Sequence, residues 1–269
     1  MSFRVPRFLV VAGSGLLLSL SFAACAQSSV GIRAGANVAS MALLVPAGQP
    51  KAEVTPLLGA QVGVVLNVRV GKLAFQPGLL FSQKGYAAGS LGGVAPTTYA
   101  VGDTLVRRGV EVTRKGRDYL RLNYLEMPLN VVYTFGETGG AQLIFGPYVG
   151  MGLNGRIHTD GFTVTEHLTK TVGGQLVADQ TRPLSEAGAS DIPVTFSTNF
   201  VYQQRPYLQR LDVGLTGGLG FATGPVQVQA LYGWGIANLA ESRNGLGTAQ
   251  VRAYHRVGQL TLTYLPGWE

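Results

Sequence analysis

Five charged residues lie in segments that otherwise alternate between apolar residues and small or polar ones: Arg33, Arg69, Lys84, Glu126 and Asp212. Each has the parity of the small or polar positions in its segment. Because successive side chains of an extended strand point to opposite faces, we expect these charges on the polar face of a sheet. Charges of both signs on one face can pair with each other or line a path for ions.

The three histidines are the other candidates for chemistry: His158, His167 and His255. Asp160 and Glu166 lie close to the first two in the sequence. A histidine with a carboxylate and a serine can form a nucleophilic site, but this spacing matches no known signature. No HExxH motif or cysteine pair is present. We therefore expect no catalytic residue, no metal site and no cofactor, and the protein is not predicted to be an enzyme.

A third group of charges lies in residues 87–117, a Gly-rich polar segment that we expect to be a long loop. Its five basic residues outnumber Asp103 and Glu111: Arg107, Arg108, Arg114, Lys115 and Arg117. Two interpretations stay open. The segment is either a solvated face that meets an anionic lipopolysaccharide surface, or a site that recognises an acidic surface ligand.

Residues 119–153 best indicate the element that positions these side chains. In the first arm Leu125, Met127 and Leu129 alternate with polar or small residues, and in the second Leu143, Phe145 and Val149 do the same. The alternate residues of the second arm, which include Tyr148 and Asn154, are predicted to face inward. Each arm is long enough for a tilted transmembrane strand, which needs about 9–11 residues. We interpret the pair as a hairpin of a membrane β-barrel.

The same alternation predicts eight strands along the chain: 30–41, 58–70, 73–86, 119–134, 141–153, 208–223, 226–239 and 254–265. The connections between them alternate long and short. Outer-membrane barrels have an even number of strands, short periplasmic turns and longer external loops. The sequence thus predicts an all-β fold, an eight-stranded antiparallel up-and-down transmembrane barrel in a Gram-negative outer membrane. Both termini are then periplasmic.

Two alternatives to this fold remain. In the long insertion 154–206, residues 162–172 and 192–201 alternate enough to form an extra hairpin above the membrane, or to insert and make ten strands. The second alternative is a soluble barrel or sandwich that buries the apolar face. The inward positions are too small and polar to favour it.

The N-terminal residues predict export. Arg4 and Arg7 precede an apolar run, and Ala24-Cys25-Ala26 has the form of a signal-peptidase site. We expect residues 1–26 to be a signal peptide and residues 27–269 to be the barrel domain. The alternative is lipidation of Cys25, the only cysteine.

The charge balance is modestly basic. Loss of Arg4 and Arg7 leaves 19 Lys and Arg against 14 Asp and Glu, a net charge of +5. Because the basic residues are scattered, without aromatic residues between them, nucleic acid is not an expected partner.

Several motifs together resemble the PorT-like outer-membrane β-barrel family of Gram-negative bacteria: GIRAGAN at 31–37, YLEMPL at 124–129, GPYVG at 146–150, DVGLTGGLG at 212–220 and YGWGIAN at 232–238. The resemblance implies an eight-stranded barrel in the outer membrane. Since one member of that family takes part in secretion and maturation of surface proteases, it also implies a link to protein secretion and a partner in the secretion machinery or at the cell surface.

The interior charges give the expected function. The lumen of an eight-stranded barrel is just wide enough for side chains to fill it. We therefore expect a polar plug in which Lys84 pairs with Glu126, and a structural or surface-interaction role in contact with outer-membrane lipid and lipopolysaccharide. A narrow pore for small solutes is the second possibility, and a lipid-modifying enzyme is a distant third.

Overall fold

The computed structural model describes residues 27–45, 47, 53–89, 93–101, 103–114, 116–137, 139–172, 175–196, 207–240 and 252–267. The predicted signal peptide with Cys25 and residues 197–206 lie outside these residues. No helix in the described part of the chain is long and apolar enough to cross a membrane.

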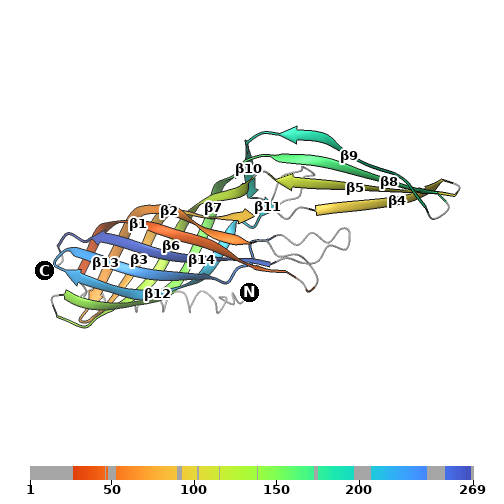
Figure 1. The fold of residues 1–269 in the computed structure, drawn as a ribbon. Helices are drawn as coiled ribbons and strands as arrows, with labels where there is room; N and C mark the ends of the chain where they lie inside the picture. The colour runs from red at the N-terminus through yellow and green to blue at the C-terminus, as the bar shows by residue number, and fades with distance from the viewer. Residues whose placement is uncertain are drawn as a thin grey trace, which may run out of the picture.

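Eight antiparallel strands form a closed ring (Figure 1). In ring order they are β1 (Gln27–Leu44), β2 (Val54–Val70), β3 (Leu73–Gly89), β6 (Arg117–Thr134), β7 (Gly139–Thr159), β12 (Leu211–Thr223), β13 (Val226–Gly235) and β14 (Arg252–Tyr264). The ring closes where β1 pairs with β14, with Ile32 opposite Tyr264. The eight predicted strands are thus confirmed, and several extend a few residues further at their outer ends.

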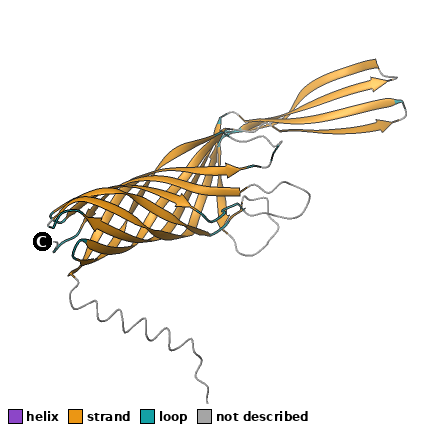
Figure 2. Ribbon diagram, turned by 90° about the horizontal axis from the view of Figure 1, so that it is seen from below, coloured by secondary structure: helices purple, strands orange, loops and turns teal. Residues whose placement is uncertain are grey.

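Tight turns join the strands at the end of the barrel that also holds the C-terminus (Figure 2). Gly71 and Gly224 have φ values of 61° and 49°, in the left-handed region that glycine adopts without steric cost. Glycine is also needed where strands lie close together: a Cβ on Gly63 or Gly218 would lie 2.1 Å from a backbone oxygen of the neighbouring strand. These residues permit the close strand packing of a small barrel.

The two faces of the barrel wall differ as the alternation predicts. Apolar side chains face outward and are exposed, among them Ile32, Leu79, Phe145, Leu219 and Trp234. Polar side chains face inward and are buried, among them Asn37, Gln76, Asn130 and Gln227. A soluble barrel would reverse this arrangement, so the exposed apolar belt fits a barrel surrounded by lipid.

Residues 87–117 do not form a loop. They contain β4 (Gly93–Val101) and β5 (Thr104–Arg114), which join β8 (Phe162–Val172) and β9 (Gln175–Ala187) in a four-stranded antiparallel sheet of order β4-β5-β8-β9. We call this sheet the extension; it projects beyond the barrel at the end opposite the tight turns (Figures 1 and 2). The prediction of a loop was wrong because strands outside a membrane need no continuous apolar face.

The 154–206 insertion also differs from its prediction. Residues 162–172 form a strand, β8, as predicted, but β8 pairs with β9 and β5, and the predicted partner strand 192–201 is described only up to Phe196. β10 (Ser190–Phe196) instead pairs with the outer end of β7, and with the short β11 (Tyr207–Leu208) in parallel. Neither β8 nor β10 enters the ring, so the ten-stranded barrel is not formed.

Candidate functional site: the interior of the barrel

Four ionisable interior side chains come from four separate strands and meet at one level of the lumen. Lys84 lies on β3, Glu126 on β6, Asp212 on β12 and His255 on β14. Glu126 and Asp212 each lie opposite Gly150 of β7, one on either side. Because Gly150 has no side chain, none stands between the two carboxylates on β7, and Lys84 pairs with both.

The Lys84 ammonium is bound on several sides. It forms ion pairs with Glu126 Oε2 and, at 3.0 Å, with Asp212 Oδ2. It also lies 4.5 Å from the ring centre of Tyr148 and 5.3 Å from that of Tyr124. Lys84, Glu126 and Asp212 are at most 3% exposed. A buried cation is tolerated when opposite charges and aromatic faces replace its water in this way.

Asp212 is held by two further groups. His255 Nδ1 lies 2.9 Å from Asp212 Oδ2, and the Tyr148 hydroxyl donates to Asp212 Oδ1 at 3.4 Å. The edge of the Tyr124 ring meets His255, with 5.3 Å between the ring centres. We call Lys84, Glu126, Asp212, His255, Tyr124 and Tyr148 the central cluster. It joins β3, β6, β7, β12 and β14 across the lumen.

A second polar layer lies nearer the tight turns. Arg33 donates through Nε to Thr263 Oγ1 at 2.8 Å and through Nη2 to Gln76 Oε1 at 3.2 Å. Gln76 Nε2 in turn donates to Asn67 Oδ1 at 2.8 Å and to Gln227 Oε1 at 3.1 Å. All of these side chains are buried. The layer crosses the barrel with hydrogen bonds from one wall to the other.

An apolar layer lies on the other side of the central cluster, at the outer end of the barrel. Leu120, Leu122, Tyr124 and Val194 pack together there with Phe196 and Leu208. Val194 and Phe196 belong to β10, which lies beside the outer end of β7 beyond the point where β12 begins. The interior is therefore layered: hydrogen-bonded amides and Arg33, then the central cluster, then an apolar cap.

The five predicted interior charges lie at different levels of the barrel. Lys84, Glu126 and Asp212 meet, whereas Arg33 lies in the separate amide layer. Arg69 lies at the turn end, where it donates to the carbonyls of Gly71 at 2.7 Å and Glu137 at 2.5 Å. Arg69 therefore links two turns. Neither of these two hydrogen bonds involves the central cluster.

Sequence reasoning missed the role of His255, which it grouped with the loop histidines. The signal was present, because His255 has the parity of the inward Gln259, Thr261 and Thr263. Tyr124 and Tyr148 likewise have the inward parity of their strands, which places their rings where they can contact Lys84.

The basic residues of 87–117 are spread over strands. Arg107 and Arg108 are consecutive on β5 and so point to opposite faces. Arg114 ends β5, Arg117 begins β6, and Lys115 lies outside the described residues. Arg108 pairs with Glu166 of β8, and Arg182 of β9 pairs with the same carboxylate at 2.5 Å. Hydrogen bonds from Arg182 and Arg108 lower the pKa of Glu166.

The two remaining histidines lie on the outer surface. His158 Nδ1 is 3.0 Å from Asp191 Oδ1 and its Nε2 is 3.6 Å from Asp160 Oδ1. His167 Nε2 is 3.0 Å from Glu111 Oε2, and its Nδ1 is 3.0 Å from Thr181 Oγ1. Within the described ranges, no group of three or more His, Cys, Asp or Glu residues is arranged to hold a metal ion.

The closed ring, the exposed apolar belt and the polar interior define an outer-membrane β-barrel. The chain belongs to the family of the outer membrane protein beta-barrel domain, whose model matches residues 24–241. No curated protein matches its sequence.

Among solved structures, the chain is similar to Neisserial surface protein A, at 12% identity and a TM-score of 0.31, over 88% of this chain and 98% of that chain. It is also similar to the toluene transporter TodX of P. putida, at 9% identity and a TM-score of 0.23, over 88% of this chain and 89% of that chain. At these values the similarities carry no inference about function.

Proposed function

We propose that this outer-membrane protein is a closed barrel with a structural or surface-interaction role, and that its working surfaces are the extension and the outer wall. The burial of the interior carries the proposal. Residues from the central cluster and the amide layer are each at most 3% exposed, including Lys84, His255, Gln76 and Gln227. In a conducting pore, water would reach such side chains.

The orientation follows from the lengths of the connections. Outer-membrane barrels place their short turns in the periplasm. On that rule the three tight turns, Gln27 and the end of β14 lie on the periplasmic side, and the extension lies outside the cell. This arrangement is consistent with a Gram-negative protein that is exported by a cleaved signal peptide.

The partners follow from the same placement. The apolar belt would contact outer-membrane lipid, and the charged outer surface would meet lipopolysaccharide. The resemblance to the PorT-like family extends the proposal to a protein partner in secretion or surface-protein maturation. Within the described residues, the hydrogen bonds and ion pairs of His158 and His167 are with carboxylates and Thr181, and His255 is buried against Asp212, so we do not propose catalysis.

Conductance across a planar bilayer tests the closed lumen. The folded protein, identified by a shift in gel mobility on boiling, is expected to insert without producing discrete current steps. An open porin added to the same bilayer provides the positive control. Reproducible single-channel steps from the folded band would overturn the proposal.

One observation favours a narrow pore as the second candidate. Several buried interior amide atoms have no hydrogen-bond partner among the described residues, including both amide atoms of Gln61, Asn130 Oδ1 and Gln229 Oε1. Buried amides of this kind commonly bind water. A file of water molecules past these groups would give small current steps in the experiment above.

A further inference from the structure

A β-bulge changes which side chains of β7 face outward. Asn123 of β6 lies opposite Asn154, and the next residue, Tyr124, lies opposite Gly152, so Leu153 is an extra residue on β7. Below the bulge the odd residues of β7 are exposed, as at Phe145 and Met151. Beyond it the even residues Asn154, Arg156 and His158 are exposed. The expectation that Asn154 faces inward was therefore wrong, because a bulge re-aims the side chains that follow it.

The bulge builds a polar region on the outer wall directly above the apolar belt. Going outward from Leu125 and Met151, the cross-strand pairs of β6 and β7 are Asn123 with Asn154, then Arg121 with Arg156, then Tyr119 with His158. Asn123 Nδ2 donates to Asn154 Oδ1 at 2.6 Å, and the rings of Tyr119 and His158 are 6.2 Å apart. The strands thus display amides, then two arginines, then aromatic rings.

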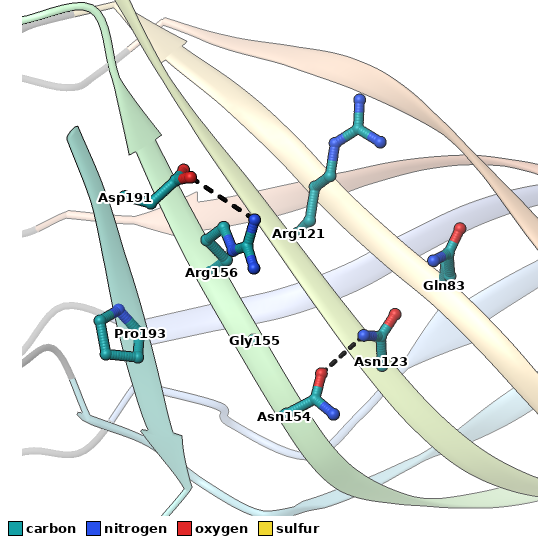
Figure 3. A pocket seen from close by; sticks show the side chains of 8 residues that line it. All are labelled: Gln83, Arg121, Asn123, Asn154, Gly155, Arg156, Asp191 and Pro193. Carbon is teal, nitrogen blue, oxygen red and sulfur yellow. Dashed lines mark hydrogen bonds and ion pairs between the residues drawn. The ribbon is translucent and has the colours of Figure 1, made fainter. Parts of the chain in front are cut away.

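A pocket of about 560 Å³ lies over these pairs. Its lining comes from β3, β6, β7 and β10: Gln83, Arg121, Asn123, Asn154, Gly155, Arg156, Asp191 and Pro193. Figure 3 shows the Arg121 and Arg156 side chains on neighbouring strands at the same level. We call this pocket the arginine pocket.

The two arginines are an unfavourable pair in isolation. Like charges directly opposite each other on neighbouring strands destabilise a sheet. Arg121 forms no ion pair or hydrogen bond with another residue of the described chain. Among the described residues, Arg156 pairs with Asp191 at 3.5 Å, and the two side chains are 68% and 49% exposed. Such an exposed pair contributes little to stability. With two arginines and one aspartate in its lining, the pocket has a net positive charge.

We infer that the arginine pocket binds the phosphate group of an outer-leaflet lipid. Two guanidinium groups on adjacent strands can donate to one phosphate, and the amides of Asn123 and Gln83 are further donors. The acyl chains of that lipid would lie on the apolar belt below, over Phe81, Leu125 and Met151. This inference deepens the proposed contact with lipopolysaccharide and rests on the orientation given above, because it requires this end of the barrel to lie in the outer leaflet.

Binding of lipid A with and without its phosphates tests the assignment. The probes are diphosphoryl lipid A and fully dephosphorylated lipid A, each added to the folded protein in detergent and followed by native mass spectrometry. The wild type is expected to bind the diphosphoryl form about tenfold more tightly. Arg121→Gln combined with Arg156→Gln is expected to abolish that preference by weakening binding of the diphosphoryl form alone.

A matched control distinguishes binding in the arginine pocket from a general effect of positive charge. Arg107→Gln with Lys170→Gln removes the same charge from exposed positions on the extension and should leave the preference unchanged. An equal loss in both double variants, or a preference retained in the pocket variant, would overturn the inference. Competition by inorganic phosphate at the lipid concentration would also overturn it, since the ligand would then not be a membrane lipid.

A second variant covers the case in which the double substitution fails to fold. Arg121→Glu places an opposite charge beside Arg156, so it is expected to raise resistance to unfolding in plain detergent while abolishing the preference for phosphorylated lipid. Retained preference in this variant would contradict the inference. If the barrel conducts ions but still prefers diphosphoryl lipid A, the proposal of a closed lumen is wrong and the assignment of the arginine pocket stands.

Discussion

Lys84 shows how a membrane barrel can hold an ionised side chain in its interior. Removing an ammonium from water costs several kcal/mol, and the cost is offset only by close opposite charge. Glu126 and Asp212 provide that charge, and the rings of Tyr124 and Tyr148 cover the remaining sides. These partners come from three strands, β6, β7 and β12, so the stability of the ring depends on the set as a whole.

Glu126→Gln should therefore destabilise the barrel. The substitution keeps the size of the side chain but leaves Lys84 with one carboxylate in a buried site. We expect the free energy of unfolding to fall on the order of 3 kcal/mol, as for other broken buried pairs. Urea unfolding in detergent measures it, with the exposed Glu53→Gln as the control. Equal unfolding midpoints for the two variants would show that the pair contributes nothing.

Single residues were predictable from the sequence where the alternation is unbroken. Parity alone predicted that Lys84, Glu126 and Asp212 face the lumen. Their convergence at one level was not predictable for Asp212, because the stagger between distant strands is set by the closure of the barrel. Arg69 lies at the rim by the tight turns, close to the end of its strand, and hydrogen bonds to the turns hold it there.

At the scale of elements, the bulge in β7 and the extension are the features that alternation could not predict. The only sequence signal of this bulge is one change in the alternation. Without the structure, Leu153 and Asn154 fit equally well as consecutive residues of a regular strand. Residues 87–117 were predicted to be a loop because β5 carries charges such as Arg107 within short apolar runs. Residues 162–172 were predicted to be a strand and form β8. Pairing between β5 and β8, distant in sequence, is what makes them a sheet.

Deletion of Leu153 is expected to be tolerated. Without the extra residue, Gly152 and Asn154 become neighbours opposite Tyr124 and Asn123, and every side chain of β7 keeps its present face. Deletion of Val149 is the matched control, since it turns all later β7 side chains to the other face, within a regular stretch of pairing. We expect a boiling-dependent gel shift for the first variant and none for the second. The reverse result would show that Leu153 is not the bulged residue.

The whole molecule combines a closed interior with an elaborated outer surface. The amide layer, the central cluster and the apolar cap fill the lumen in succession, while β4, β5, β8 and β9 extend beyond it. The even number of strands and the alternation of long and short connections were enough to predict the barrel. The filling of the lumen depends on side-chain contacts across strands, which only the structure provides.

The most direct test of the closed interior is the reactivity of a cysteine placed inside it. Ser82 faces the lumen, is 0% exposed and accepts a hydrogen bond from Asn37. In a protein that lacks Cys25, Ser82→Cys should resist a small charged thiosulfonate reagent until the barrel is unfolded by boiling. Ser185→Cys on exposed β9 should react at once. Equal reactivity of the two cysteines in the folded protein would contradict a packed lumen and favour a water-filled pore.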